Sequence, residues 1–312
     1  MGIGGFNSSE QGGLVMDPLA YYTTQSSITD PGENMGLFAD LPRTIDGLCR
    51  VVQGLGLHYK TGEMYGYQIP KERLPEINTR YIDKILGRII ELDERPLIEP
   101  RPPYKRLICS CSDFTTLFCA MARHQGMPSR ARVGFAAYFT KANPDFNVSH
   151  EIAEVWDSNE KRWRLVDAEL DDIALQKNDI GFDTHDVPRD QFLVAGQVWQ
   201  TCRAGRADPN RFGVGNIKGL GIIRGNLIQD LAAQNKMELL NWDCWGLMLS
   251  EVETHTDEQR RLLDKVALLT QTGSEALSEI QAIYEAQPFL KVPRVITCYD
   301  PVGKPSEITL RL

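Results

Sequence analysis

The pattern of apolar and polar residues predicts its clearest helix over residues 111–125. The apolar side chains there recur at i, i+3, i+4 and i+7, the spacing of one helix face: Phe114, Leu117, Phe118 and Met121. Ser110 and Asp113 form a capping-box pattern, which makes Cys111 the first helical residue. Gly126 marks the far end, because glycine readily takes the left-handed conformation that ends many helices. The sequence therefore predicts a cysteine at the N-terminus of a helix.

Strand-like patterns follow this helix. Residues 131–139 alternate between apolar and other side chains with the period of a half-buried strand. Two further strand-like runs, 150–156 and 162–167, are joined by the sequence DSNEK, which favours a turn. These two runs predict an antiparallel hairpin.

The register of this hairpin decides whether two chemically useful residues meet. If the loop is residues 157–160, Trp156 pairs with Lys161 and His150 lies directly opposite Asp167. A register two residues looser leaves His150 and Asp167 diagonal on the same face. A one-residue slip would place them on opposite faces.

Other segments carry weaker signals. Further helices are expected over residues 45–54, 81–92, 226–240, 257–271 and 274–286, with a short one after Pro188. The glycine-rich residues 203–225 are expected to form irregular loops.

These elements predict an α+β fold with four parts along the chain. Residues 1–35 lack periodicity and are expected to be a flexible tail or an arm draped over the surface. Residues 36–105 form a helical lead-in packed on a core, and residues 106–200 form that core. Residues 201–312 are a loop-rich and then helical extension of the same compact unit.

Composition narrows the class of protein. The chain has 312 residues, of which 42% are hydrophobic and 24% charged, as expected for a globular protein with a sizeable core. Its formal net charge of -8 argues against nucleic acid or an acidic membrane as the main partner. The seven cysteines are scattered without a CxxC pair or a zinc pattern, which suggests free thiols, a reducing compartment and no bound metal. No signal peptide or membrane span is recognisable, so a cytoplasmic location is expected.

Cys111 is the main candidate for chemistry. The positive end of a helix dipole favours the thiolate and lowers a cysteine pKa, although the nearby Asp113 opposes part of this effect. A cysteine nucleophile needs a base, and the base needs a group that fixes its orientation. His150 and Asp167 suit these two roles.

The residues that carry these features resemble the transglutaminase-like superfamily, which has a papain-like Cys-His-Asp fold. The similar segments are CSCSDFTTLFCAMARHQGMPSRARVGF, SHEIAEVW and KRWRLVDAEL. The resemblance implies a cysteine helix packed on an antiparallel sheet, with Cys111 as nucleophile, His150 as base and Asp167 as orienting carboxylate. It covers about residues 106–170. The segments FLVAGQVWQTCRAG and GNLIQDLAAQNK are similar to those of a bacterial group within the superfamily.

Two departures from the family pattern matter. Cys109 and Ser110 stand where a small residue, often glycine, commonly precedes the cysteine, so Cys109 competes for the role of nucleophile. Cys111 is favoured, because Cys109 lacks the capping box. Glu151 follows His150 in place of an apolar or aromatic residue. Cys109, Trp156 and Trp163 are considered as pocket residues, the two tryptophans as core or pocket wall.

The expected reaction is acyl transfer through an acyl-enzyme on Cys111, with an oxyanion bound by the backbone N–H of Cys111. The substrate is expected to contain an amide or thioester, in a peptide, a small molecule or a carrier-bound acyl group. Water as acceptor gives a peptidase or amidase, and an amine gives an amide-forming acyltransferase. No cofactor is expected. The alternative is an inactive binding or structural module of the same fold.

Overall fold

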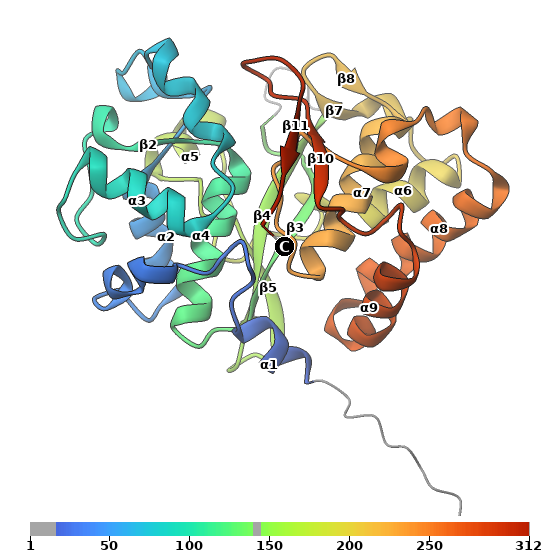
Figure 1. Cartoon of the computed structure of the whole chain (residues 1–312), viewed down its shortest axis with the longest axis horizontal. Coiled ribbons are helices and arrows are strands. Elements are labelled where there is room, and N and C mark those ends of the chain that lie inside the picture. Colours follow the sequence, from blue (N-terminus) through green and yellow to red (C-terminus); the bar gives the residue numbers. More distant parts are fainter. Residues whose placement is uncertain (1–16, 140–144, 312) are drawn as a thin grey trace, which may run out of the picture.

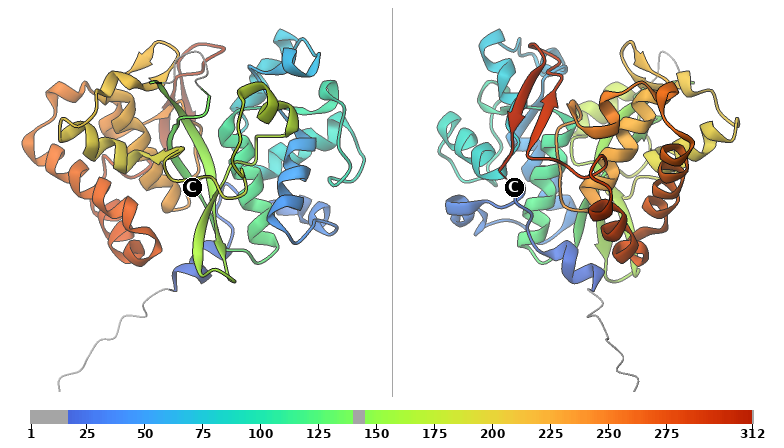
Figure 2. Two further views of the ribbon diagram at one scale, coloured as in Figure 1. Left: turned by 180° about the vertical axis from the view of Figure 1, so that it is seen from behind. Right: turned by 45° about the vertical axis from the view of Figure 1, so that its right-hand side comes forward.

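A computed structural model describes residues 17–139 and 145–311 of the chain (Figure 1). The fold is α+β, as predicted, with a central mixed sheet between two groups of helices. The view from behind and the 45° view in Figure 2 both show the long central strands running between these groups.

The central sheet has the strand order β6-β3-β4-β7-β8, and β5 pairs with β4 off this path. The strands are β3 (Ser129–Ala136), β4 (Asn147–Asp157), β5 (Arg162–Val166), β6 (Phe192–Val194), β7 (Phe212–Val214) and β8 (Ile217–Lys218). The pairs β3–β4, β4–β5, β3–β6 and β7–β8 are antiparallel, and β4–β7 is parallel. The predicted strand and hairpin are therefore confirmed as β3, β4 and β5.

One group of helices comes from the first half of the chain. It contains α2 (Ile45–Leu55), α3 (Ile82–Leu92), α4 (Cys111–His124) and α5 (Asp172–Asn178). Apolar residues of α2, α3 and α4 share one buried cluster with β4 and β5, so α4 lies between the other helices and the sheet. A short parallel pair, β1 (Gly56–His58) and β2 (Leu107–Cys109), links α2 to the start of α4.

The second group covers the opposite face of the sheet and comes from the second half of the chain (Figure 1). It contains α6 (Ala195–Arg203), α7 (Leu220–Gln234), α8 (Asp257–Thr272) and α9 (Leu277–Ala286). These helices share a second buried cluster with Phe135 of β3. A small antiparallel sheet of β9 (Asp243–Cys244), β10 (Val295–Cys298) and β11 (Ser306–Thr309) completes the chain.

Short 3-10 helices make up most of the remaining regular structure. They are η1 (Gly32–Phe38), η2 (Gly62–Tyr65), η3 (Lys71–Asn78), η4 (Pro103–Lys105), η5 (Pro209–Arg211), η6 (Gly246–Leu249), η7 (Val252–Thr254) and η8 (Gly273–Ala276).

The prediction of a flexible tail over residues 1–35 is wrong for its described part. Residues 17–35 include α1 (Pro18–Thr23) and the start of η1, and they bury the side chains of Tyr22 and Ile28 completely. Tyr22 donates a hydrogen bond to the carbonyl of Gln234 at 3.0 Å. Tertiary packing thus orders a segment without helical periodicity of its own. Residues 1–16 lie outside the described residues.

The predicted helices are present, but some of them begin at other residues than predicted. The helix expected over 226–240 is α7, which begins six residues earlier inside the segment predicted as loops. The same segment also contains β7 and β8. The short helix expected after Pro188 is instead α6, which begins at Ala195.

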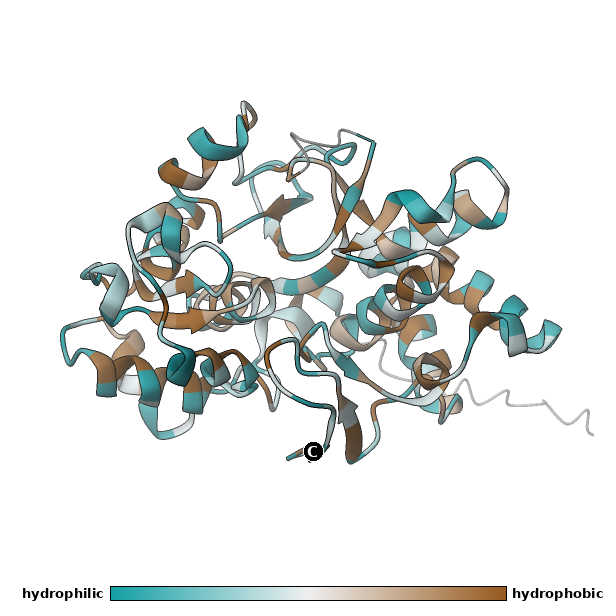
Figure 3. Ribbon diagram, turned by 90° about the horizontal axis from the view of Figure 1, so that it is seen from above, coloured by the Kyte–Doolittle hydropathy of each residue, from teal (hydrophilic) through white to brown (hydrophobic). Residues whose placement is uncertain are grey.

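Hydropathy alternates along many of the helices in Figure 3, as expected for helices with one face on a core. Among the described residues, no helix is long and apolar enough to cross a membrane. All seven cysteines are free.

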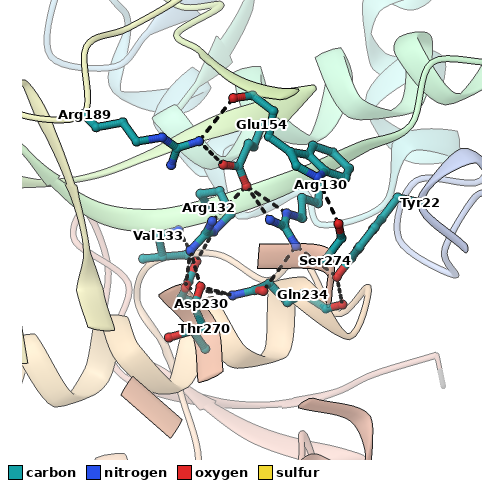
Figure 4. A network of polar contacts seen from close by, with 11 residues as sticks. Tyr22, Arg130, Arg132, Val133, Glu154, Arg189, Asp230, Gln234, Thr270 and Ser274 are labelled. Atoms are coloured by element: carbon teal, nitrogen blue, oxygen red, sulfur yellow. Dashed lines mark hydrogen bonds and ion pairs between the residues drawn. The ribbon is translucent and has the colours of Figure 1, made fainter. Parts of the chain in front are cut away.

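A network of buried charges connects the sheet to the second group of helices (Figure 4). Arg132 of β3 lies 2.9 Å from Asp230 of α7 and 2.8 Å from Glu154 of β4. Glu154 also accepts hydrogen bonds from Arg130 at 2.8 Å and Arg189 at 2.7 Å. These contacts explain why strand positions facing a helix layer are charged here, since a buried charge needs a close partner.

Candidate active site

Cys111 is held where β2 meets α4. Its neighbour Ser110 is the N-cap, and the Asp113 carboxylate accepts hydrogen bonds from the Ser110 backbone N–H at 2.7 Å and from its hydroxyl at 2.9 Å. β1 packs closely here through Gly56, where an added Cβ would lie 2.6 Å from the ring of Phe114. The predicted helix start is therefore confirmed, and Cys111 is buried with only 9% of its surface exposed.

His150 and Asp167 meet, although through the looser register. Trp156 pairs with Trp163, two residues from the pairing first expected, and the ladder ends at Ala153 and Val166. His150 is therefore beyond the end of its pairing with β5, and Asp167 follows the last residue of that strand. The two side chains remain on one face, with 2.9 Å between His150 Nε2 and Asp167 Oδ2.

Aromatic residues enclose this pair. Tyr138 donates a hydrogen bond from its hydroxyl to Asp167 Oδ2 at 2.7 Å. The ring of Phe139 lies edge-on to the imidazole, with 4.9 Å between centroids, and Phe192 of β6 lies 6.4 Å away. β6 can approach because Gly134 faces it, and a Cβ there would lie 2.3 Å from the carbonyl oxygen of Leu193.

The electrostatics couple the histidine to both neighbours. Burial opposes protonation of His150, but the charge and hydrogen bond of Asp167, together with Cys111, raise the His150 pKa well above its ordinary value. Burial also raises the pKa of the Cys111 thiol, while a hydrogen bond with His150 and its charge lower it. The net direction for Cys111 is upward, so the expectation that the helix start alone lowers its pKa is wrong. Because His150 Nε2 contacts Asp167, Nδ1 is the nitrogen left to serve the thiol.

The residue after the histidine has a local explanation. Glu151 accepts a hydrogen bond from the Ser112 hydroxyl at 2.9 Å, and its backbone carbonyl accepts one from Thr115 at 3.0 Å. Burial raises the pKa of Glu151 to about 8. At neutral pH it is therefore mainly a neutral carboxylic acid that ties β4 to the first turn of α4.

No sequence pattern predicts the next residue at the site, Asn241. Its side-chain Nδ2 lies 3.0 Å from Cys111 Sγ, although it stands 130 residues further along the chain. It comes from the connection between α7 and β9, in the C-terminal group of elements.

A cavity of about 110 Å³ lies beside the site. Phe114, Phe139 and Glu169 are among its lining residues, and Phe139 also packs on His150. An outer groove of about 560 Å³ shares Gln53, Arg106 and Asp171 with this cavity. The groove and the cavity therefore lie next to one another.

Residues 103–168 match the family model of the transglutaminase-like superfamily. This stretch is a transglutaminase-like core. The superfamily generally includes cysteine-dependent acyltransferases and hydrolases. Searches among curated proteins and among solved structures gave no match.

The transglutaminase-like core supplies Cys111, His150, Asp167 and Tyr138. Glu169 lies one residue beyond the matched stretch, and Asn241 lies far outside it. Within the described residues, no group of three or more His, Cys, Asp or Glu side chains is arranged to hold a metal ion.

The other residues considered from sequence lie elsewhere. The Cys109 thiol is buried and donates to the carbonyl of Leu107 at 3.3 Å, and burial raises its pKa well above the ordinary value. Trp156 and Trp163 contact one another at the turn end of the hairpin, with 5.7 Å between centroids. Six residues along a strand separate Trp156 from His150, which is about 20 Å. The two tryptophans therefore do not line the cavity beside Cys111.

Tyr138 had a weak signal in the sequence, as a polar aromatic residue inside the predicted strand 131–139. Asn241 had none, because its approach to Cys111 depends on how the C-terminal elements fold back.

Proposed function

We propose that the protein is a cysteine-dependent acyl-transfer enzyme in which Cys111, His150 and Asp167 act as nucleophile, base and orienting carboxylate. The observation that carries this proposal is the sequence of contacts from Asp167 to His150 and from His150 to Cys111. The match to the transglutaminase-like superfamily supports it independently.

The proposed reaction begins when Sγ of Cys111 attacks the carbonyl carbon of an amide or thioester. The C–S bond forms, and the C=O electron pair moves to oxygen. His150 holds the proton taken from the thiol and gives it to the leaving amine or thiol as the scissile bond breaks. Asp167 stabilises the charged imidazole in between. His150 then takes a proton from the acceptor, which attacks the acyl-enzyme and releases Cys111.

Acyl-enzyme trapping tests this proposal directly. The protein is incubated with a panel of N-acetylcysteamine thioesters and p-nitrophenyl esters of different chain length, quenched in acid and digested for mass spectrometry. We expect an acyl group on the Cys111 peptide of the wild type and none in Cys111→Ser. Cys109→Ser, the matched control, should be acylated like the wild type.

The competing functions give different results. An adduct on Cys109 would overturn the choice of nucleophile. An inactive binding or structural module of the same fold predicts no adduct with any member of the panel.

The cavity favours an amine as acceptor. Glu169 lines it, and Glu169 Oε2 is buried without a hydrogen bond from any described residue. Burial raises the pKa of this carboxyl to about 7, so part of the population is negatively charged at neutral pH. Asp171 and Arg106 line the same cavity with opposite charges, so the ionised part of Glu169 gives the cavity its excess negative charge. A negatively charged cavity attracts a cationic amine and not a neutral one.

This preference can be measured as a ratio of products. Water and an added amine compete for the acyl-enzyme. The amine is either putrescine, which is cationic at pH 7, or hydroxylamine, which is neutral at pH 7. We expect Glu169→Gln to lower the ratio of aminolysis to hydrolysis for putrescine but not for hydroxylamine. Equal effects on both amines, or no saturable effect of putrescine on the wild type, would argue for water as the acceptor.

A further inference from the structure

The connection between α7 and β9 brings one side chain to the sulfur of Cys111. Asn241 Nδ2 lies 3.0 Å from Sγ, within hydrogen-bond distance. Asn241 Oδ1 is buried and has no hydrogen bond among the described residues. A buried amide oxygen without a hydrogen bond destabilises the fold. The amide nevertheless keeps its N–H group on the thiol, and this orientation points to a function for Asn241.

We infer that the Asn241 side chain is the second oxyanion donor of the site, and that Arg80 and Asp243 position it. The inference rests on the proposed acyl transfer. When Sγ attacks a carbonyl carbon, the oxygen that gains charge lies within one bond of the carbon joined to sulfur. A donor already 3.0 Å from the sulfur is therefore close to that oxygen.

The first donor comes from the start of α4. The first N–H groups of a helix have no partner within it, and the N–H of Cys111 belongs to this set. Two donors on one oxygen, one from the backbone and one from a side chain, stabilise the tetrahedral intermediate. On collapse the electron pair returns to the carbonyl, and the leaving group takes its proton from His150.

The loop around Asn241 is fixed on both sides. Arg80 from the first half of the chain donates to both oxygens of Asp243, at 2.8 and 2.7 Å, and both side chains are buried. Asp243 also donates its backbone N–H to the carbonyl of Leu240 at 2.8 Å. The indole of Trp242 donates to Asn78 at 3.0 Å. The neighbours of Asn241 are therefore held by residues outside the transglutaminase-like core.

Two reactions of Cys111 distinguish an oxyanion donor from a residue that changes only the reactivity of the thiol. Acylation by p-nitrophenyl acetate passes through an oxyanion, whereas alkylation by iodoacetamide does not. Both rates are measured for Asn241→Ala and Asn241→Asp on the high-pH plateau, where the thiol is fully ionised. Asn159→Ala, in the exposed turn of the hairpin, is the matched control.

We expect acylation of the Asn241 variants to fall by roughly 10²–10³-fold, the loss typical for one oxyanion donor. Alkylation should fall by less than about tenfold, the effect of one ordinary hydrogen bond. Equal losses in the two reactions, or no loss of acylation, would overturn the role. If the wild type is alkylated but never acylated by any ester or thioester, the proposed function itself fails.

The positioning role of Arg80 and Asp243 is tested through Asn241. Asp243→Asn should lower kcat for acylation with little change in KM. In the Asn241→Ala background the same substitution should cost nothing further, because the group that it positions is gone. An equal loss in both backgrounds would overturn the positioning role.

Trp242→Phe, which removes the indole N–H, provides a second variant if Asp243→Asn does not fold. Thermal melting establishes which variants are folded. Trp242→Phe should lower kcat in the wild-type background and leave kcat unchanged in the Asn241→Ala background. An equal loss of kcat in both backgrounds would show that the contacts of this loop do not act through Asn241.

Discussion

The hydroxyl of Tyr138 lies 2.7 Å from Oδ2 of Asp167. The same oxygen receives His150 Nε2 at 2.9 Å, so the tyrosine and the histidine share one acceptor. Burial and the neighbouring Asp167 raise the pKa of Tyr138 well above its ordinary value, which keeps the hydroxyl protonated and donating. Tyr138 therefore holds the carboxylate in the position that orients His150.

This arrangement predicts a graded loss of activity. Tyr138→Phe removes one hydrogen bond to a charged group, worth roughly 1.5–3 kcal/mol, and should lower the acylation rate by about 10- to 100-fold. Asp167→Asn should lower it by about 10⁴-fold, as expected for loss of the orienting carboxylate. Stopped-flow acylation measures both rates. Tyr299→Phe, at an exposed position, is the control and should not change the rate.

The reactivity of Cys111 should depend on pH through His150. Burial raises the thiol pKa, and the hydrogen bond and charge of His150 lower it. Replacing His150 by Gln removes the lowering effect. We therefore expect the midpoint of the alkylation rate against pH to move to higher pH in His150→Gln. The measurement is the rate of iodoacetamide labelling mapped to the Cys111 peptide, and an unchanged or lower midpoint would contradict the proposed contact.

Glu151 should make stability depend on pH in the direction opposite to most carboxylates. Burial raises its pKa from 4.5 to about 8, so the folded state binds the proton more tightly than the unfolded state. Its favourable contribution is complete below about pH 4.5 and is lost as the pH rises toward 8. Glu151→Gln stays neutral throughout this range.

Urea unfolding at pH 5 and pH 9 checks this sign. The free energy of unfolding of Glu151→Gln should exceed that of the wild type at pH 9 by a few kcal/mol, since one unit of pKa shift corresponds to about 1.4 kcal/mol. At pH 5 the two proteins should be much closer. A variant less stable at pH 9 than at pH 5, relative to the wild type, would show that Glu151 is charged in the folded protein.

The buried charges between β3 and α7 predict a large effect on stability. Asp230 accepts hydrogen bonds from Arg132 at 2.9 Å and from the backbone N–H of Val133 at 2.9 Å. Asp230→Asn leaves Arg132 with only part of its compensating charge. The free energy of unfolding should fall by roughly 3–5 kcal/mol in chemical denaturation. Asp190→Asn, at an exposed position, should change it by less than about 0.5 kcal/mol.

The features predicted most accurately are those that depend on residues close together in the sequence. The start of α4 depends on Ser110 and Asp113, which are neighbours in sequence, and the structure has this helix as expected. The meeting of His150 with Asp167 depends on a hairpin with a short turn, so two registers out of three bring the side chains to one face. The observed register is the looser one, with Lys161 in a left-handed conformation at the end of the turn.

The rest depends on contacts between distant parts of the chain. Tyr22 is buried because it packs against α7 and β3. No pattern within residues 1–35 indicates these contacts. The upward shift of the Cys111 pKa depends on burial, which a helix-dipole argument does not include. Asn241 reaches the thiol through the folding back of the C-terminal elements, and the nearby contact between Arg80 and Asp243 joins residues 163 positions apart.

The ion network also constrains how the protein can be made on the ribosome. Arg132 and its partner Asp230 are separated by 98 residues. While the nascent chain ends before α7, the face of β3 that carries Arg132 has neither the cover of α7 nor the carboxylate of Asp230. The face of β3 that packs on α7 can therefore reach its native packing only after the C-terminal helices have been made.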